Sequence, residues 1–196
     1  MMSKRILVIQ GHPDNSAPHL NHALADAYSD GARAAGHEVR VVTVSALDFP
    51  LLRSQHDWEH GEVPATLKTA QEDILWAEHL VVYFPLWLGG MPAVLRAFLE
   101  QVLRPGFAFS YSKSNPMGVK GLKGRSARIV VTMGMPSLFY KWFFRAHSLK
   151  ALKRNILGFV GIAPIRQTVI GMSANLKPED FKKLLGLMQK LGREGT

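Results

Sequence analysis

The chain lacks several features that would point to common protein classes. It contains no cysteine, which excludes disulfides, zinc–thiolate centres and thiol nucleophiles. No stretch approaches ~20 apolar residues, so no transmembrane helix is predicted, and the apolar start is too short for a signal peptide. The sequence also has no Walker lysine motif, G-x-G-x-x-G fingerprint, G-x-S-x-G elbow or paired carboxylates of a glycosidase. The absence of targeting signals leads us to expect a cytoplasmic protein.

Composition and charge further restrict the class of protein and its partners. The 196 residues are 47% hydrophobic and 20% charged, with no internal repeat or low-complexity segment. This is typical of an ordered globular protein, and we expect a single domain over residues 1–196. The 24 basic and 15 acidic residues give a formal charge of +9, which favours anionic partners. On charge alone, a phosphate-bearing small molecule and nucleic acid are equally compatible.

One stretch organises the rest of the chain. Residues 79–84 are apolar, β-branched or aromatic apart from the first, as in a strand buried on both faces. Pro85 cannot donate to a sheet ladder and should end that strand. Gly89 and Gly90 allow tight backbone geometry, and Pro92 suits the first turn of the amphipathic helix that follows.

Strands and helices alternate along the whole sequence. Further strands are expected at 5–10, 38–44, 128–132 and 165–170, and helices at 19–35, 66–76, 139–157 and 178–191. Residues 47–64 and 104–124 are expected to be irregular. This alternation predicts an α/β, doubly wound, five-stranded parallel sheet of flavodoxin-like order 2-1-3-4-5, with a ligand between strands one and three.

Three loops should open on the carboxyl edge of that sheet. Residues 11–21 carry hydroxyl, amide and imidazole groups ahead of a helix, a position that favours an anion, although Ser16 or Asn21 could simply cap a turn. Residues 85–91 offer backbone groups and Trp87, which could equally be packing. Residues 132–140 add a hydroxyl, methionines and a phenol. Together the loops suit a ligand with a phosphate tail and a flat ring system.

Specific residues in these loops carry a family resemblance. His12 with Ser16 and Asn21, the segment 84–92, and Phe107-Ala108-Phe109-Ser110-Tyr111 resemble the flavodoxin-fold NAD(P)H:quinone oxidoreductases, a group that includes DT-diaphorase. The resemblance covers roughly residues 4–175. It implies a flavin, either FAD or FMN, with NAD(P)H as co-substrate, quinones as acceptors and a homodimer, and no nucleic acid as partner. The first loop would hold the flavin phosphates, and the other two would pack along its ring. The implied cofactor contacts are His12, Ser16, His19, Leu20, Asn21, Pro85, Leu86, Trp87, Leu88, Gly89, Thr132 and Gly134.

The resemblance also implies two catalytic side chains. Members of the family place a tyrosine and a histidine beside the flavin, where they steady charge during hydride transfer. Tyr140 matches the tyrosine without a gap, and His147 lies one place beyond the position of the histidine. Two departures are visible: Met133 and Met135 interrupt the family's Thr-Thr-Gly-Gly run, and Leu88 replaces a glutamine beside the tryptophan.

Some alternatives stay open. A flavin-binding ancillary subunit of an ion-transport system would use the same fold, whereas a one-electron carrier fits the basic charge and the Tyr140/His147 pair less well. His56 and His60 are interpreted as part of a surface loop, and no metal site is predicted. The aromatic run 139–144 could be core, a dimer contact, the wall of a substrate pocket or a shallow membrane contact.

Overall fold

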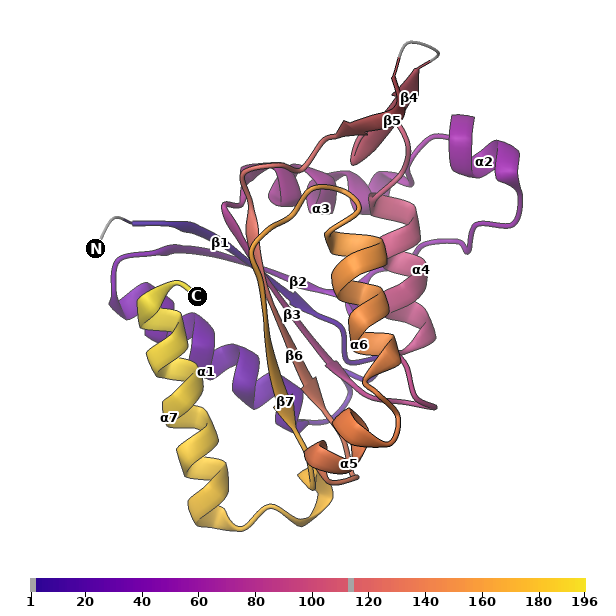
Figure 1. The fold of residues 1–196 in the computed structure, drawn as a ribbon. Helices are drawn as coiled ribbons and strands as arrows, with labels where there is room; N and C mark the ends of the chain where they lie inside the picture. The colour runs from indigo at the N-terminus through magenta and orange to yellow at the C-terminus, as the bar shows by residue number, and fades with distance from the viewer. Residues whose placement is uncertain (1–2, 113–114) are drawn as a thin grey trace.

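The computed structural model describes residues 3–112 and 115–196, so positions 1–2 and 113–114 of the predicted domain lie outside it. At its centre is a five-stranded, all-parallel sheet of order β2-β1-β3-β6-β7 (Figure 1). Its strands are β1 (Arg5–Gln10), β2 (Glu38–Thr43), β3 (His79–Pro85), β6 (Ser126–Thr132) and β7 (Ile165–Ile170). The prediction of a parallel α/β sheet is confirmed, and β3 lies at its centre and ends at Pro85 as expected.

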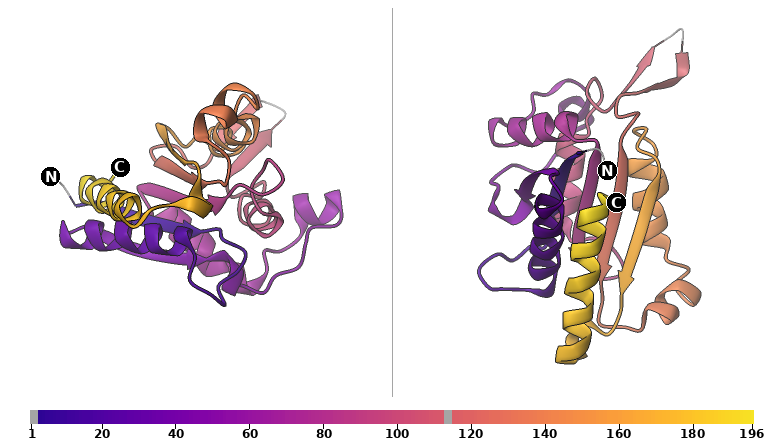
Figure 2. Two further views of the ribbon diagram at one scale, coloured as in Figure 1. Left: turned by 90° about the horizontal axis from the view of Figure 1, so that it is seen from below. Right: turned by 90° about the vertical axis from the view of Figure 1, so that its left-hand side faces the viewer.

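Helices cover both faces of this sheet. On one face lie α1 (Leu20–Ala34) and α7 (Pro178–Glu194), and on the other α3 (Ala65–Trp76), α4 (Ala93–Val102), α6 (His147–Ala151) and the π-helical turn η2 (Leu152–Leu157) (Figure 2). Side chains alternate along each strand, so Ile6 and Val8 join one core while Leu7 and Ile9 join the other. Short 3₁₀ turns, η1 (Val44–Ala46) and η3 (Ser173–Asn175), complete the connections.

Three sequence expectations need correction. The segment 104–124 is not irregular, because it contains the antiparallel strands β4 (Phe109–Ser112) and β5 (Asn115–Lys120), which shift the strand numbering relative to the predicted order. Residues 47–64 include α2 (Gln55–His60), which Ser54 caps by accepting a hydrogen bond from the backbone N–H of Asp57.

The third correction concerns the helix expected over 139–157. It is divided into α5 (Ser137–Trp142), α6 and η2. Arg145 and Ala146 adopt left-handed backbone conformations, with φ of 50° and 48°. Because a right-handed helix cannot continue through such residues, the chain turns sharply between α5 and α6.

The helices α1 and α7 touch backbone to backbone. A methyl group at Gly31 would overlap the carbonyl oxygen of Gln189, and one at Gly192 would overlap that of Tyr28. Glycine at both positions therefore permits this close approach. Met188, also on α7, packs its side chain into the core beside Tyr83. Among all the helices in the described ranges, none is long and apolar enough to cross a membrane.

Candidate functional site

The three predicted loops do meet at the carboxyl edge of β1, β3 and β6, and Thr132 lies at their junction. The side-chain amide of Asn21 donates to Thr132 Oγ1 at 3.1 Å, and the backbone N–H of Leu86 donates to the Thr132 carbonyl at 2.7 Å. The rings of His12 and Trp87 meet edge to face, with centroids 6.1 Å apart. One strand end thus fixes the positions of both neighbouring loops.

Gln10, the last residue of β1, holds the first loop in place. Its side chain is buried, and its Oε1 accepts a hydrogen bond from the backbone N–H of His12 at 3.0 Å. Its Nε2 donates to the carbonyl of Asn21 at 2.9 Å. A single amide therefore links the start of the loop to the first turn of α1, which fixes the distance between them.

Three imidazoles cluster in this loop. The rings of His12 and His19 stack with centroids 3.9 Å apart, and His22 lies 5.3 Å from His12. Burial lowers the pKa of both His12 and His22, and the neighbouring imidazole of His19 acts in the same direction. Within the described ranges, no three His, Cys, Asp or Glu side chains are arranged to hold a metal ion. Near neutral pH, His12 and His22 offer uncharged donors and acceptors.

Donors in this loop surround the carboxylate of Asp14. Its Oδ1 accepts hydrogen bonds from the backbone N–H and the hydroxyl of Ser16, at 2.8 and 2.6 Å. His19 Nε2 lies 2.7 Å from its other oxygen. The Ser16 hydroxyl, followed by His19, holds the pKa of this carboxyl well below its usual range. Ser16 and His19, both predicted to contact phosphate, are therefore already arranged around a negatively charged oxygen group.

The second loop forms a tight, exposed turn. Trp87 and Gly90 exchange two backbone hydrogen bonds of 2.9 Å each. Between them, Leu88 and Gly89 have φ values of 44° and 75°, the signs found in a type I′ turn. Leu88 is fully exposed at the tip, and about half of the Trp87 side chain is exposed. Apolar and aromatic surface is thus presented at the edge of the sheet.

The edge offers both open backbone and unpaired polar atoms. A methyl group added at Gly89, Gly90 or Gly134 would have no neighbour within 4 Å. Close by, Asn21 Oδ1 and His22 Nε2 are buried without a hydrogen-bond partner within the described structure. Buried polar groups normally find partners, and open glycines let a ring approach the main chain. These residues fit a flat group that carries a phosphate.

The remaining predicted contacts take different positions. Pro85 is buried at the end of β3, Leu86 packs on the core shared with α4, and Leu20 begins α1 and packs on the opposite core. Tyr140 lies in α5 with its side chain buried, and its hydroxyl is 2.7 Å from Ser148 Oγ. His147 begins α6 and is exposed. The hydroxyl partner of Tyr140 in this structure is Ser148, not His147.

Comparison with known proteins decides the family. The sequence matches the family described as having the flavodoxin-like fold, over residues 4–191. The chain belongs to this family.

Three proteins that are similar to this chain are oxidoreductases by name. An uncharacterized NAD(P)H oxidoreductase from Haemophilus influenzae is 26% identical over 84% of this chain and 82% of its own length. An FMN-dependent NADH:quinone oxidoreductase from Bacillus cereus is also 26% identical, over 92% of each chain. The solved structure of an NAD(P)H:quinone oxidoreductase from Methanothermobacter marburgensis, 21% identical, covers both chains fully with a TM-score of 0.81 and so supports the fold.

Sequence reasoning missed two residues of this flavodoxin-like edge. The expected strand at 5–10 ends at Gln10, and the sequence predicts no role for Asp14. A signal for Gln10 was present, because a polar residue that ends a buried apolar strand usually serves a hydrogen-bond network. No comparable signal marked Asp14, whose role depends on the folded position of His19.

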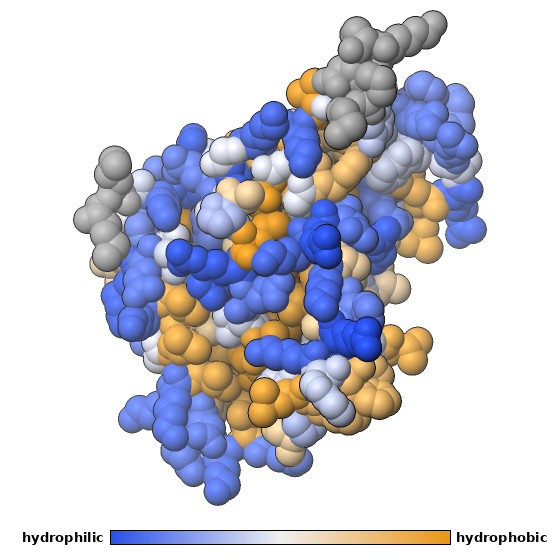
Figure 3. All heavy atoms as spheres, in the orientation of Figure 1, coloured by the Kyte–Doolittle hydropathy of each residue, from blue (hydrophilic) through white to orange (hydrophobic). Residues whose placement is uncertain are grey.

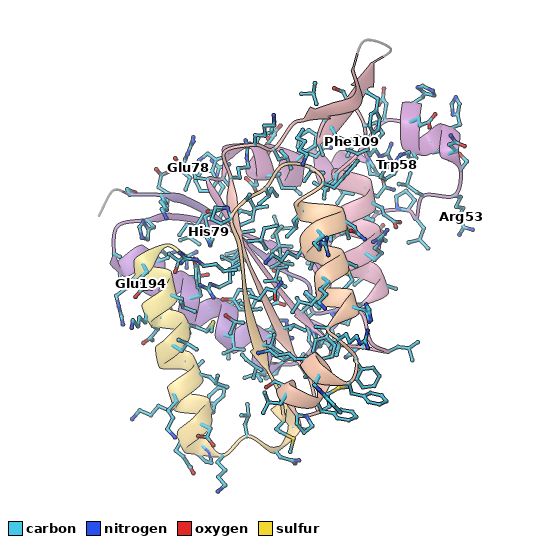
Figure 4. The ribbon with its side chains drawn as sticks, viewed as in Figure 1. Arg53, Trp58, Glu78, His79, Phe109 and Glu194 are labelled. Carbon is cyan, nitrogen blue, oxygen red and sulfur yellow. The ribbon has the colours of Figure 1, made fainter. Side chains whose placement is uncertain are left out.

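A separate apolar cavity lies toward the C-terminal end of α4, away from the three loops. Trp58, Phe109 and Phe159 line it, with ring centroids of Phe109 6.3 Å from Trp58 and 4.9 Å from Phe159. Figure 4 shows Trp58 and Phe109 together, well away from α5. None of the predicted flavin contacts lines this cavity.

Proposed function

We propose that this chain is an FMN-dependent NAD(P)H:quinone oxidoreductase, built as a single flavin-binding domain over residues 1–196. The observation that carries the proposal is the junction at Thr132, where three loops with phosphate donors, open glycines and exposed aromatic surface meet. The names of the relatives support the activity, and the name of the Bacillus cereus relative supports FMN rather than FAD.

The residues divide into two binding functions. Ser16 and His19 donate to the phosphate of the cofactor and exchange their present partner, the Asp14 carboxylate, for it. Asn21 is held by Gln10 through its backbone carbonyl and by Thr132 through its side-chain amide, and its Oδ1, which has no partner among the described residues, is proposed to accept from the cofactor. The second and third loops provide the surface for the ring, at Trp87, Leu88, Gly89 and Gly134. A bound flavin supplies the ring that accepts hydride from NAD(P)H and passes it to a quinone.

Tyr140 and His147 are the proposed hydride-assisting residues. A phenol or imidazole that donates to developing negative charge lowers the barrier to hydride transfer. Support comes from the ungapped match of Tyr140 and from its location in α5, at the end of the predicted third loop. The Tyr140 hydroxyl lies 2.7 Å from Ser148 Oγ and also accepts from the backbone N–H of Leu149, so its oxygen is held in place by two partners.

The test begins with the purified protein. Its absorbance spectrum should show bound flavin, and mass analysis of the released flavin should give FMN. Oxidation of NADH and NADPH should then depend on an added water-soluble quinone. Purified protein that takes up neither FMN nor FAD on reconstitution would refute the proposal.

Two further parts of the proposal concern assembly and location. We expect a homodimer, as the resemblance implies, and light scattering of the flavin-loaded protein would measure it directly. A stable, fully active monomer would contradict this expectation. Location in the cytoplasm stays a prediction from the sequence.

The ion-transport alternative receives no support from the relatives reported above, whose names describe oxidoreductases. Turnover separates the two functions. An ancillary subunit would bind a transport protein tightly and show negligible quinone reduction alone, whereas the enzyme turns over without a partner.

A further inference from the structure

Five large apolar side chains form an exposed cluster on and after α5, which we call the aromatic face. Trp142 and Leu138 are 81% and 77% exposed. The other three are phenylalanines whose rings touch one another, with centroids 5.0 to 5.6 Å apart. The aromatic face consists of Leu138, Phe139, Trp142, Phe143 and Phe144. Figure 3 shows apolar side chains gathered in this part of the surface, at the lower right over α5.

The aromatic face is not accounted for by packing within the chain. Tyr140 alone of the run 139–144 is buried and joins the core. The left-handed residues Arg145 and Ala146 turn the chain away after the run, so α5 protrudes from the carboxyl edge of the sheet. Large exposed patches of this kind usually mark interaction surfaces.

The charge around this face has one sign. Between Glu100 and Glu179 the sequence contains thirteen lysines and arginines and no acidic residue. Lys141 lies in the sequence between Phe139 and Trp142 of the aromatic face, Arg145 and Lys150 follow it, and all three are exposed. In Figure 3, hydrophilic side chains border the apolar patch directly. The segment that protrudes from the edge therefore combines exposed aromatic rings with positive charge, and within the described residues Lys141, Arg145 and Lys150 form no ion pair.

This charge decides between the possible occupants. In a dimer whose two-fold axis passes through this face, the same surface would meet itself, and Lys141, Arg145 and Lys150 would face a second set of positive charges. An anionic bilayer instead matches both properties, because aromatic and leucine side chains enter the headgroup boundary while lysine and arginine bind anionic lipids. We propose that the aromatic face docks this protein on membranes that contain anionic lipids.

Docking would also define the class of acceptor. The face begins at Leu138, and only four residues separate Thr132, the junction of the flavin site, from the start of α5 at Ser137. Contact through α5 therefore brings the flavin edge close to the lipid surface. Resting on the proposed function, this inference assigns the acceptor to the class of lipophilic quinones dissolved in the bilayer.

Binding is tested first, without any measurement of activity. The flavin-loaded protein is sedimented with phosphatidylcholine vesicles that either contain or lack phosphatidylglycerol. We expect binding to the anionic vesicles that weakens as salt is raised, because surface charge is screened. Equal recovery in the supernatant with both vesicles would overturn the proposal.

Paired variants separate the apolar and charged contributions. Trp142→Ser with Phe143→Ser should weaken binding to anionic vesicles about tenfold or more. Lys141→Gln with Lys150→Gln should weaken it about 25-fold, since each basic group near an anionic surface contributes about fivefold. Matched controls are Leu51→Ser, another exposed apolar side chain, and Lys182→Gln with Lys190→Gln on α7. Controls that lose binding as strongly as the α5 variants would overturn the assignment to this face.

Activity then distinguishes failure of this inference from failure of the proposed function. The Trp142/Phe143 variant should reduce a water-soluble quinone at the wild-type rate, yet lose at least about tenfold of its rate with a long-chain quinone embedded in anionic vesicles. Equal rates of both proteins with the embedded quinone would refute docking and leave the oxidoreductase function intact. Light scattering provides the remaining check: a variant that turns from dimer to monomer, with unchanged vesicle binding, would assign the aromatic face to a second copy instead.

Discussion

Gly134, in the third loop, offers a way to test the proposed flavin site without damaging the fold. Its backbone φ is not in the left-handed region, and a methyl group there would meet no atom within 4 Å. Gly134→Val should therefore change the free energy of unfolding by less than about 1 kcal/mol, with any gain arising from the restricted unfolded chain. If the flavin ring lies against this backbone, the valine branches occupy its place. Overpacking of this kind costs about 1–3 kcal/mol, which corresponds to a dissociation constant raised about 5- to 150-fold.

The assay combines two measurements on the same protein. Urea unfolding of the flavin-free protein reports the stability of the fold, and titration of that protein with FMN reports affinity. Gly186→Val in α7 is the matched control, since its added side chain also meets open space but lies on a helix remote from the loop. Unchanged FMN affinity in Gly134→Val would remove the third loop from the flavin site. A large loss of stability in the flavin-free variant would instead show that the space beside Gly134 is needed for folding.

Three further predictions address separate parts of the molecule. Ser16→Asp should weaken flavin retention on dialysis, because it adds a negative charge where phosphate is expected; unchanged occupancy would contradict the assignment of this loop. Tyr140→Phe should slow the reduction of bound flavin by NAD(P)H about 10- to 1000-fold in stopped-flow measurements, with a smaller effect for His147→Ala; a wild-type rate would leave Tyr140 as a structural partner of Ser148. Burial lowers the pKa of His79, at the start of β3 (Figure 4), to about 3, so stability should fall as pH drops below the unfolded value of about 6.5. At pH 5 the wild type should lose about 2 kcal/mol relative to pH 8 that His79→Gln does not lose, and equal losses in urea unfolding would refute this.

Hydrophobic patterning predicted the sheet well because its signal is local. The apolar runs of β1 and β3 follow directly from two-sided burial, and Pro85 marks the end of β3 through its missing N–H. The hairpin of β4 and β5 was missed for a physical reason. Its glycines and prolines are typical of loops, and pairing between the two strands is a tertiary property that single-strand patterns do not contain.

The sequence predicted which loops form the candidate site, but not the hydrogen bonds between their residues. Donor-rich sequences before α1 and after β6 indicated where a ligand would bind, and their meeting at Thr132 agrees with the rule for parallel sheets. Gln10 and Asp14 could not be assigned because their partners are set by three-dimensional packing. The break between α5 and α6 was equally invisible, since neither Arg145 nor Ala146 is a residue that favours left-handed backbone.

The glycine contact between α1 and α7 links the C-terminal helix to the position of the candidate site, although α7 carries none of the predicted site residues. The first turn of α1 carries Asn21 and His22, and its far half rests against the backbone of α7 at Gly31 and Gly192. Any residue larger than glycine at either position would push the two helices apart and shift α1 relative to the sheet. A change at Gly31 or Gly192, both outside the three loops, would then weaken the proposed flavin binding by displacing the first turn of α1.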